Sequence, residues 1–479
     1  MNVSPANPAR KRGPLGLVEP FAQLVGGHGR RGGQTARRSS RSQRRRFAGR
    51  SWVAFLWVWG VATWGALSLP PERPDLRALA AEPDGMIASP EPDWPQWRGP
   101  RRDAMASETG LLPTWPAGGP RLLWKQESLG KGWSSPIVVG DRIYITGDVG
   151  EDLVVFALDL DGRIQWRTTN GKSWTGSFPG ARATCCFSEG RLYHINAHGR
   201  AACLDAATGK EAWAVDVLER FGSRNITWAI SECPLVDGPR LIVTPCGEKA
   251  LMAALDKNTG QTVWVTEPLL EDRASYCSPV LFRHAGRRLL ASCSSAHGFG
   301  VDADTGRRLW TVPLKNQYGV NVTPPVYGDG KIFYVTAYTP AVQYALAATD
   351  SGFEAKRTWS NALDTVTGGA VLVGGRLYAA GYSKRKWWFA FDWNTGETLA
   401  EQKGLSTGAA VYADGRLYCL AEDGHAALLQ PVAAGLEIAG KFPLGPKTQR
   451  DAWAHPVVCR GRLYLRYHET LWCYDVRAR

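Results

Sequence analysis

Short runs that alternate apolar and polar residues recur along the chain from about residue 120 to its end. Alternation with a period of two predicts β-strands, and a glycine-containing turn between two such runs predicts a hairpin. Eight runs begin with such a turn, followed by a basic residue and then by aliphatic or aromatic residues. They occupy residues 140–144, 189–193, 238–243, 286–290, 329–333, 374–378, 414–418 and 460–464.

A second turn motif follows most of the hairpins, about twenty residues further on. Its aspartate can accept backbone N–H bonds across the turn, its glycine can adopt a positive φ, and its tryptophan begins the next strand. Full copies contain Asp159, Gly162 and Trp166; Asp205, Gly209 and Trp213; Asp256, Gly260 and Trp264; and Asp302, Gly306 and Trp310, with a partial copy at 390–399.

The two motifs together define a repeat of four short strands. Residues 132–479 divide into eight such units of about 43 residues, the period of a propeller blade. One small sheet cannot bury its own faces, whereas eight stacked around an axis can, and the repeated tryptophan would fill the space between neighbours. The last unit lacks one strand. The segment 121–127, with Trp124, matches the missing outer strand, so we expect it to complete that blade and close the ring.

The charge of the chain is concentrated at its N-terminus. Residues 1–50 hold twelve Lys and Arg against one acid, whereas residues 51–479 have a net charge of only +2. The arginine-rich tail 1–50 is expected to be disordered. The remainder is expected to contain a signal or transmembrane segment at 51–69, a linker at 70–92, an N-terminal segment with the closing strand at 93–131, and the propeller at 132–479. A nearly neutral folded part gives no support for nucleic-acid binding.

The uncharged run Ser51–Leu69 follows the basic tail, which is the layout of an export signal. Two outcomes stay open. The segment is cleaved after Ala80, where Ala78-Leu79-Ala80 forms an A-x-A pattern, or it is retained as a single membrane anchor. In either case we expect the propeller to lie outside the cytoplasm, in the periplasm or attached to the membrane.

The second turn motif resembles the tryptophan-docking motif of the quinoprotein alcohol dehydrogenase-like propellers, which are built from PQQ-like repeats. Residues 254–264 match that motif in full, and residues 93–100 (DWPQWRGP) resemble an N-terminal segment found in exported members. The resemblance covers roughly residues 93–479 and implies an all-β, eight-bladed propeller. It leaves activity open, because the family contains both PQQ-dependent dehydrogenases and non-catalytic members such as an outer-membrane-assembly lipoprotein.

The adjacent pair Cys185-Cys186 is similar to the vicinal disulfide that covers the cofactor in the quinoprotein alcohol dehydrogenases. Alignment of the repeats gives a simpler interpretation, because Cys185 occupies the position that holds Pro or Ala in six other units. No acid trio for Ca²⁺ is recognisable. A lipid-modified N-terminal cysteine is excluded, since no cysteine precedes Cys185.

The inner strands of a propeller line its axial channel, so residues just before the aligned Pro/Ala position are the candidates for ligand contact. An ordinary water-filled channel is the alternative. The candidates are polar or aromatic: Trp133, Arg182, Trp228, Glu232, Tyr276, Asn321, Thr323, Trp453 and His455, with Thr367 and Thr407 in the same register.

Ten cysteines form an even set, so an exported chain could form disulfides. Cys277 and Cys293 flank one hairpin, and Cys233 and Cys246 flank another; buried free thiols are the alternative. The spacing of His194 and His198 does not indicate a metal site on a strand, and nicotinamide, Walker-type and zinc-protease motifs are missing from the sequence.

We therefore predict a monomeric, non-catalytic propeller that binds or organises proteins of the cell envelope and needs no cofactor. The alternative is a PQQ- and Ca²⁺-dependent oxidoreductase acting on an alcohol or a sugar, and a second alternative is a carbohydrate or small-ligand binder.

Overall fold

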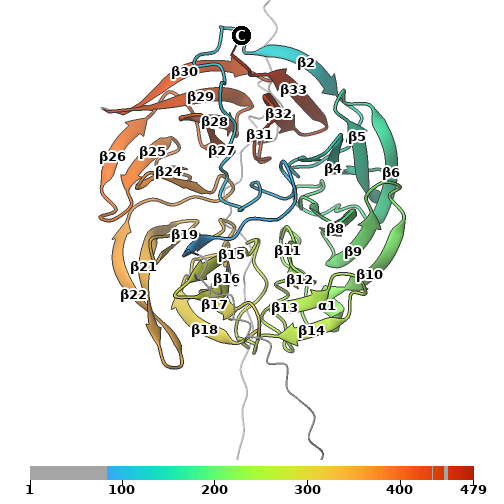
Figure 1. The fold of residues 1–479 in the computed structure, drawn as a ribbon, viewed down its shortest axis with the longest axis vertical. Coiled ribbons are helices and arrows are strands. Elements are labelled where there is room, and N and C mark those ends of the chain that lie inside the picture. The colour runs from blue at the N-terminus through green and yellow to red at the C-terminus, as the bar shows by residue number, and fades with distance from the viewer. Residues whose placement is uncertain (1–82, 434, 447–450, 479) are drawn as a thin grey trace, which may run out of the picture. The chain divides into compact units, whose positions relative to one another are not determined.

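The computed structural model describes residues 83–433, 435–446 and 451–478. These form eight antiparallel sheets around one central axis (Figure 1), which confirms the predicted all-β, eight-bladed propeller with four-stranded blades. The predicted tail 1–50, the apolar segment Ser51–Leu69 and residues 70–82 of the linker lie outside the described residues. Within the described part, no helix has the length and apolar character needed to cross a membrane.

The first four blades follow one another along the chain. Blade 1 contains β3 (Ile137–Val139), β4 (Arg142–Val149), β5 (Asp152–Asp159) and β6 (Ile164–Lys172); blade 2 contains β7 (Cys186–Ser188), β8 (Arg191–Ile195), β9 (Arg200–Asp205) and β10 (Glu211–Asp216). Blade 3 contains β11 (Leu235–Asp237), β12 (Arg240–Val243), β13 (Ala253–Asp256) and β14 (Thr262–Val265); blade 4 contains β15 (Val280–His284), β16 (Arg287–Cys293), β17 (His297–Asp302) and β18 (Arg308–Pro313).

The second half of the ring has the same order. Blade 5 contains β19 (Val326–Gly328), β20 (Lys331–Thr336), β21 (Thr339–Thr349) and β22 (Gly352–Asn361); blade 6 contains β23 (Ala370–Val373), β24 (Arg376–Ala380), β25 (Trp388–Asp392) and β26 (Thr398–Gln402). Blade 7 contains β27 (Gly408–Ala413), β28 (Arg416–Ala421), β29 (His425–Val432) and β30 (Gly435–Pro443). Blade 8 contains β31 (Val457–Cys459), β32 (Arg462–Tyr467), β33 (Thr470–Asp475) and β2 (Arg121–Gln126).

Two further elements lie outside this scheme. The short strand β1 (Gly85–Met86) adds a fifth strand to blade 4 by pairing with β15. The single-turn helix α1 (Val217–Arg220) follows blade 2, and the Asp216 side chain caps it by accepting bonds from the N–H groups of Leu218 and Glu219.

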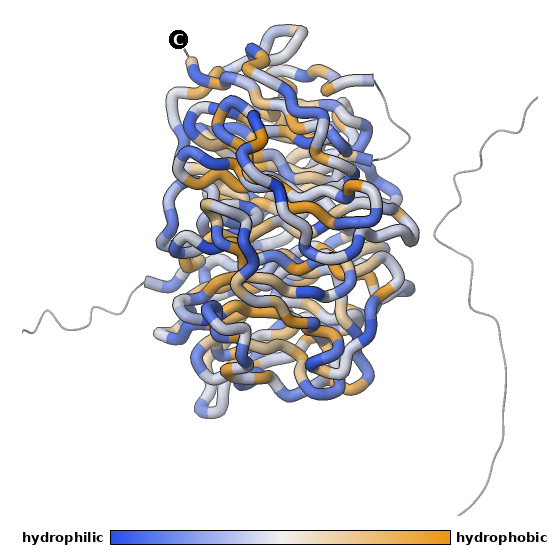
Figure 2. Tube along the Cα trace, turned by 90° about the vertical axis from the view of Figure 1, so that its right-hand side faces the viewer, coloured by the Kyte–Doolittle hydropathy of each residue, from blue (hydrophilic) through white to orange (hydrophobic). Residues whose placement is uncertain are grey.

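The core lies between the blades, along their middle strands. In β5 six consecutive residues are buried, and β8, β16 and β28 show similar buried runs. Seen side on, hydrophobic positions follow the strands while many turns are hydrophilic (Figure 2). Each sheet thus buries both faces against its neighbours, which a single blade could not do.

The second turn motif joins neighbouring blades. Trp166 of blade 1 donates its Nε1–H to the carbonyl of Ala206 in the turn of blade 2, at 3.1 Å. A Cβ atom added at Gly209 would lie 2.7 Å from the Trp166 ring, so glycine is needed for this approach as well as for its φ of +73°. Asp205 holds the turn by accepting from the N–H and hydroxyl of Thr208. Trp213 repeats the arrangement on Lys257 and Gly260.

Trp310 departs from this pattern. The hairpin of the next blade is longer, because β21 and β22 stay paired as far as Thr349 and Gly352, and its tight turn does not have the four-residue Asp-to-Gly spacing of the motif. The indole lies instead over Gly300 of its own blade, donates to the Tyr334 hydroxyl at 3.3 Å, and contacts Phe353 of blade 5 edge to face. It still fills the space between blades, by a different route.

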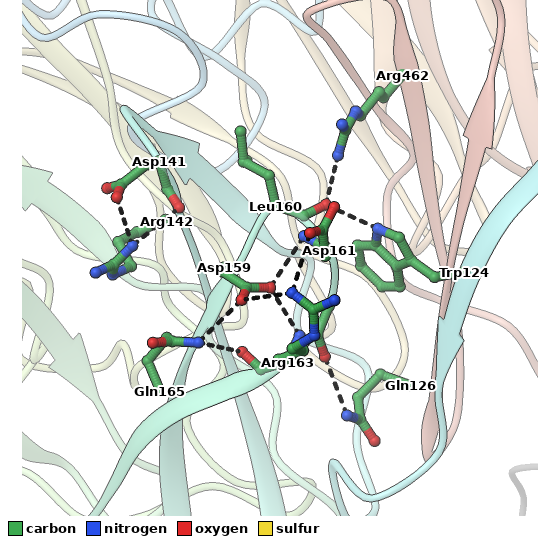
Figure 3. Close-up of polar contacts among 11 residues, drawn as sticks. Trp124, Gln126, Asp141, Arg142, Asp159, Leu160, Asp161, Arg163, Gln165 and Arg462 are labelled. Carbon is green, nitrogen blue, oxygen red and sulfur yellow. Dashed lines mark hydrogen bonds and ion pairs between the residues drawn. The ribbon is translucent and has the colours of Figure 1, made fainter.

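The ring closes as predicted. Strand β2 pairs antiparallel with β33 as the outer strand of blade 8. Its Trp124 donates to the Leu160 carbonyl of blade 1 at 2.8 Å (Figure 3). The indole also covers Gly162, as the Trp166 ring covers Gly209 of blade 2. Arg462 of blade 8 donates to the Leu160 carbonyl as well, and Gln126 donates to the Gly162 carbonyl at 3.1 Å.

The propeller has two different faces. One carries the turns between the second and third strands and the loops that cross from one blade to the next; we call it the crossover face. The opposite one carries the glycine hairpins and the tryptophan-docking turns; we call it the hairpin face. Because strand order fixes these positions, the start of each inner strand lies toward the crossover face.

Residues 84–111 run across the hairpin face and over the central axis (Figure 1). Backbone bridges join this segment to β3 at Trp94 and to β27 at Met105. Its acidic side chains accept hydrogen bonds from backbone N–H groups in the hairpin turns of four blades. In a fifth blade the direction is reversed, because an aspartate of the turn accepts from the backbone of the segment. Asp84 accepts from Ala285 N, Glu91 from Glu189 N, Asp93 from Gly140 N and Glu108 from Arg460 N and Gly461 N, while Leu111 N donates to Asp414.

Candidate functional site at the central channel

The candidate residues predicted along the axis separate into two groups. Glu232, Asn321, Thr323 and His455 are buried, with at most 5% of their surface exposed. The others contact one another as aromatic and cationic side chains near the crossover face. The aromatic members and Arg182 therefore form the candidate site, and the buried residues lie within the wall of the ring.

Arg182 is the centre of the aromatic group. Its guanidinium lies 5.4 Å from the Trp133 ring and 5.6 Å from the Trp174 ring, within the range of cation–π attraction. Trp133 and Trp453 are 5.0 Å apart between ring centroids, and Phe178 contacts Trp453 at 5.2 Å. Sequence reasoning found Trp133, Arg182 and Trp453 but missed Trp174 and Phe178, which lie in a crossover loop outside the repeat.

The guanidinium of Arg182 is committed to the protein itself. Its Nε donates to the Trp228 carbonyl at 2.9 Å, and its terminal nitrogens donate to the carbonyls of Gly180 and Phe178 at 2.5 and 2.6 Å. Burial lowers the pKa of Arg182 to about 10, so it keeps its charge at neutral pH. The residue thus holds the 177–180 loop in place and has little capacity left for a ligand.

Tyr276 and Trp228 extend the group toward blade 4. The centroids of the two rings are 6.1 Å apart, and the Tyr276 hydroxyl accepts a hydrogen bond from the backbone N–H of Trp228 at 3.3 Å. On the other side of the face Tyr338 contacts Tyr318 and Tyr382 at 5.5 and 5.8 Å, both edge to face. Tyr318, Tyr338 and Tyr382 come from turns and loops between strands, so the repeat pattern did not predict them, whereas it did predict Tyr276.

Glu422 is an acid that sequence reasoning did not find. It lies in the turn after β28, where its Oε1 accepts from the Thr367 hydroxyl at 2.9 Å. Desolvation by burial and then the nearby charge of Asp451 raise the pKa of Glu422 to about 7. Trp453 hydrogen-bonds to it, which connects this acid to the aromatic group.

Below this group, side chains from four blades and a backbone N–H of a fifth form a hydrogen-bonded chain along the inner strands. His455 N donates to Ser135 Oγ at 2.9 Å, Ser135 N to Thr184 Oγ1 at 2.9 Å, Thr184 N to Cys233 Sγ at 3.2 Å, and Cys233 N to a serine on the next blade, Ser278 Oγ, at 2.9 Å. Each member occupies the position just before or at the aligned inner strand. The hydroxyl and thiol groups therefore join blades and are not free for chemistry.

The buried candidates also have internal partners. Asn321 donates to the Ser294 carbonyl at 2.7 Å, and Thr323 donates to the Val366 carbonyl at 3.1 Å. Glu232 accepts from the N–H and hydroxyl of Thr244, while burial raises its pKa to about 7. These contacts assign structural roles to residues that the register alone placed at a channel wall.

The hairpin-face end of the channel is filled by two arginines that were not predicted. Arg98 and Arg102, from the segment 84–111, are 2% and 3% exposed. Arg98 donates to the Ala370 carbonyl at 2.5 Å, and Arg102 donates to the carbonyls of Cys233 and Pro234 at 2.8 and 3.0 Å. A Cβ at Gly369 would lie 2.4 Å from Arg98 Nη1, so the glycine leaves the space that this guanidinium occupies.

All ten cysteines are buried free thiols in the structure. Neither Cys277 and Cys293 nor Cys233 and Cys246 are joined, although the first two thiols contact each other. Cys185 and Cys186 are 1% and 3% exposed. Cys185 packs in the core between blades 1 and 2, and Cys186 faces Gln96 of the N-terminal segment, so this pair lies away from the aromatic group.

The two histidines with helical spacing do not converge. His194 is fully buried and its Nδ1 contacts the Asn170 amide at 2.9 Å, while His198 Nε2 contacts the Ser173 carbonyl at 3.0 Å. Among the residues that the structure describes, no group of three or more His, Cys, Asp or Glu side chains is arranged to hold a metal ion.

The blades, their docking turns and the closing strand define the class: the described residues form an eight-bladed β-propeller whose repeats are similar to PQQ-like repeats. Residues 152–365, from the third strand of blade 1 to the end of blade 5, match the family described as outer membrane protein assembly factor BamB. The crystal structure of BamB from Moraxella catarrhalis aligns with a TM-score of 0.51 at 15% identity, covering 72% of this chain and 95% of that one. At this identity the likeness shows the fold alone.

Curated relatives are dehydrogenases by name. Polyvinylalcohol dehydrogenase of Sphingopyxis sp. (strain 113P3) is 24% identical over 238 residues, which are 47% of this chain and 35% of that protein. Quinohemoprotein alcohol dehydrogenase ADH-IIG of Pseudomonas putida is 26% identical over 140 residues, 27% of this chain and 19% of that protein. The chain thus spans between about a fifth and a third of the length of these relatives.

Proposed function

We propose that this propeller is a non-catalytic interaction module of the cell envelope, and that its crossover face binds a protein partner. The observation that carries the proposal is a set of exposed apolar side chains on this face. Val149 at the end of β4, Phe178 and Leu270 in crossover loops and Tyr338 in a turn are 42%, 40%, 78% and 41% exposed. The other exposed large hydrophobic residues among those that the structure describes lie on outer strands: Leu122, Val263, Val265 and Leu399. Aromatic and aliphatic groups of this kind are enriched where proteins bind one another.

The polar groups of the same face favour binding over chemistry. Arg182 is held by backbone carbonyls, and the inner-strand hydroxyls and Cys233 accept bonds from neighbouring blades. The site therefore offers rigid aromatic surface rather than an activated nucleophile, and its acid with a raised pKa, Glu422, already accepts from the Thr367 hydroxyl. Anchors that are already ordered lose little conformational entropy when a partner binds.

The names of the curated relatives favour a second candidate, a PQQ- and Ca²⁺-dependent oxidoreductase of an alcohol or a sugar. The cysteines do not fit it. Cys185 and Cys186 are packed between core side chains and the N-terminal segment, and burial raises the pKa of Cys186 to about 11. A pair in this position cannot cover a planar quinone at the aromatic group.

Site-specific photo-crosslinking tests the interaction. A photoreactive residue placed at Phe178 or Tyr338 should give a discrete adduct in cell-envelope fractions, whereas one at Leu122, equally exposed on the outer strand β2, should not. Adducts that form equally at all three positions, or at none, would refute a specific partner on the crossover face.

Incubation of the purified protein with PQQ and Ca²⁺ separates the two candidates. We expect no quinone absorbance to remain with the protein after gel filtration, and no reduction of an artificial electron acceptor with alcohols or sugars. Retained quinone together with dye reduction would establish the oxidoreductase in place of the interaction module.

A further inference from the structure

Blade 3 departs further from the repeat than any other blade at the crossover face. Its turn between the second and third strands, residues 244–252, has nine residues, whereas the corresponding turns of the other blades have between two and seven. The crossover into blade 3, residues 217–234, has eighteen residues and includes α1, and the other crossovers have between five and fourteen. Closure of the ring needs neither insertion, and long loops on a rigid scaffold often carry binding residues.

Hydrogen bonds hold the two insertions of blade 3 together. The backbone N–H of Glu248 donates to the Gly222 carbonyl at 3.2 Å, and the Ser223 hydroxyl donates to the Pro245 carbonyl at 2.6 Å. The two loops are therefore fixed against each other without a ligand. A surface that is already ordered loses little conformational entropy when it binds.

A hollow of about 440 Å³ lies where these insertions meet the crossover into blade 4, and we call it the blade 3 hollow. Its volume is in the range that is usual for ligand sites. Leu269 and Leu270 give it apolar surface, and Leu270 is 78% exposed. The wall is made of residues 222–225, 246–248, 269–270 and 272–273.

Three charged side chains of this wall are exposed and have no partner. Within the described part of the chain, Arg224, Arg273 and Glu248 form no ion pair and no side-chain hydrogen bond. The fourth charged residue, Asp272, has a side chain that is only 2% exposed and accepts from the Ser294 hydroxyl. The blade 3 hollow thus presents two positive charges and one negative charge to solvent, and the protein neutralises none of the three.

We propose that the blade 3 hollow binds short peptides with free ends. The free carboxylate would pair with Arg224 or Arg273, and the free ammonium group would pair with Glu248. An apolar side chain of the peptide would lie against Leu269 and Leu270. A ligand that carries both charges can pair with acid and base at once, which a simple anion or cation cannot. The inference does not rest on the proposed protein partner, because an internal segment of a folded protein has no free ends.

Titration calorimetry of the full-length protein with the tripeptide Ala-Leu-Ala at low ionic strength provides the first test. We expect saturable binding, weakened about fivefold when the carboxylate is amidated and about fivefold when the amino group is acetylated. The tripeptide with both ends blocked represents an internal segment of a partner protein. Absence of saturable binding at millimolar concentrations, or equal binding of the free and the doubly blocked peptide, would overturn the proposal.

Variants assign each end of the peptide to its partner. The double variant Arg224→Met/Arg273→Met should weaken binding of the free peptide but not of the amidated peptide. Glu248→Gln should weaken binding of the free peptide but not of the acetylated one. The control Arg167→Met/Arg307→Met removes two exposed arginines outside the hollow and should change neither. Equal losses for free and amidated peptide in Arg224→Met/Arg273→Met would contradict the pairing of these arginines with the carboxylate.

Crystallography locates the bound peptide independently of any variant. Crystals of the wild-type protein are soaked in the tripeptide with selenomethionine in place of its leucine. An anomalous selenium peak should appear beside Leu269 or Leu270. Selenium bound only at other places on the surface would refute the assignment of the blade 3 hollow.

Discussion

Replacing Trp124 by alanine tests how the ring is closed. The indole donates one hydrogen bond to Leu160 and covers Gly162, but it is only half-buried. Truncation of a fully buried tryptophan costs about 3–5 kcal/mol, and a hydrogen bond contributes about 1 kcal/mol. For this partly exposed ring we therefore expect a loss of about 3 kcal/mol. Trp166 is the matched control, because it makes the same two contacts between blades 1 and 2.

The two variants should differ in which part of the protein opens. Trp166 belongs to β6, which a short turn joins to its partner β5, whereas β2 is joined to blade 8 only through its pairing with β33. In Trp124→Ala, the amides of β2 should exchange with solvent about a hundredfold faster, since each 1.4 kcal/mol corresponds to a factor of ten. In Trp166→Ala, exchange in β2 should not change. Unchanged exchange in β2 of Trp124→Ala would refute the closing role of this side chain.

Three further outcomes follow from the interior of the ring. Gly369→Ala should destabilise the protein by about 2 kcal/mol in a denaturant titration, because its φ is +72° and the new Cβ would meet Arg98 Nη1; a neutral effect would contradict the described position of Arg98. The raised pKa of Glu422 means that the folded state holds this proton more tightly than the unfolded state, so stability falls as pH rises from about 4.5 to about 7. Melting curves of Glu422→Gln should show a weaker fall over this range, and an identical pH profile would refute the assignment. Titration with a thiol reagent under non-reducing conditions should find ten reactive thiols after denaturation; eight would indicate one disulfide, with Cys277 and Cys293 as the pair in contact.

The parts of the fold that recur in the sequence could be predicted from it. The glycine hairpins and the docking tryptophans repeat with a fixed spacing, and Trp124 was recognisable because it matches that repeat outside the eight units. Trp310 is the exception, since its position depends on the hairpin of the next blade, which is longer and lacks the Asp-to-Gly spacing of the motif.

The contacts at the ends of the channel do not repeat, and these could not be predicted. Arg98 reaches Ala370 and Arg102 reaches Cys233, across 272 and 131 residues of chain. Register alone placed Arg182 at the channel wall, whereas in the structure the carbonyls of its own loop accept hydrogen bonds from the guanidinium. A sequence pattern identifies which residues share a position in the repeat, and not which of their polar atoms are already bonded.

The closing strand also bears on the order in which the chain folds. Residues Arg121–Gln126 are made well before their partner Thr470–Asp475, so blade 8 cannot be completed until β33 has been synthesised. Bringing such distant segments together is entropically costly and slow. Until then β2 has no pairing partner, and the face of the first blade that packs against blade 8 is uncovered. A nascent chain that has not yet reached β33 is therefore an open arc, which makes chaperone protection most valuable just before this strand is made.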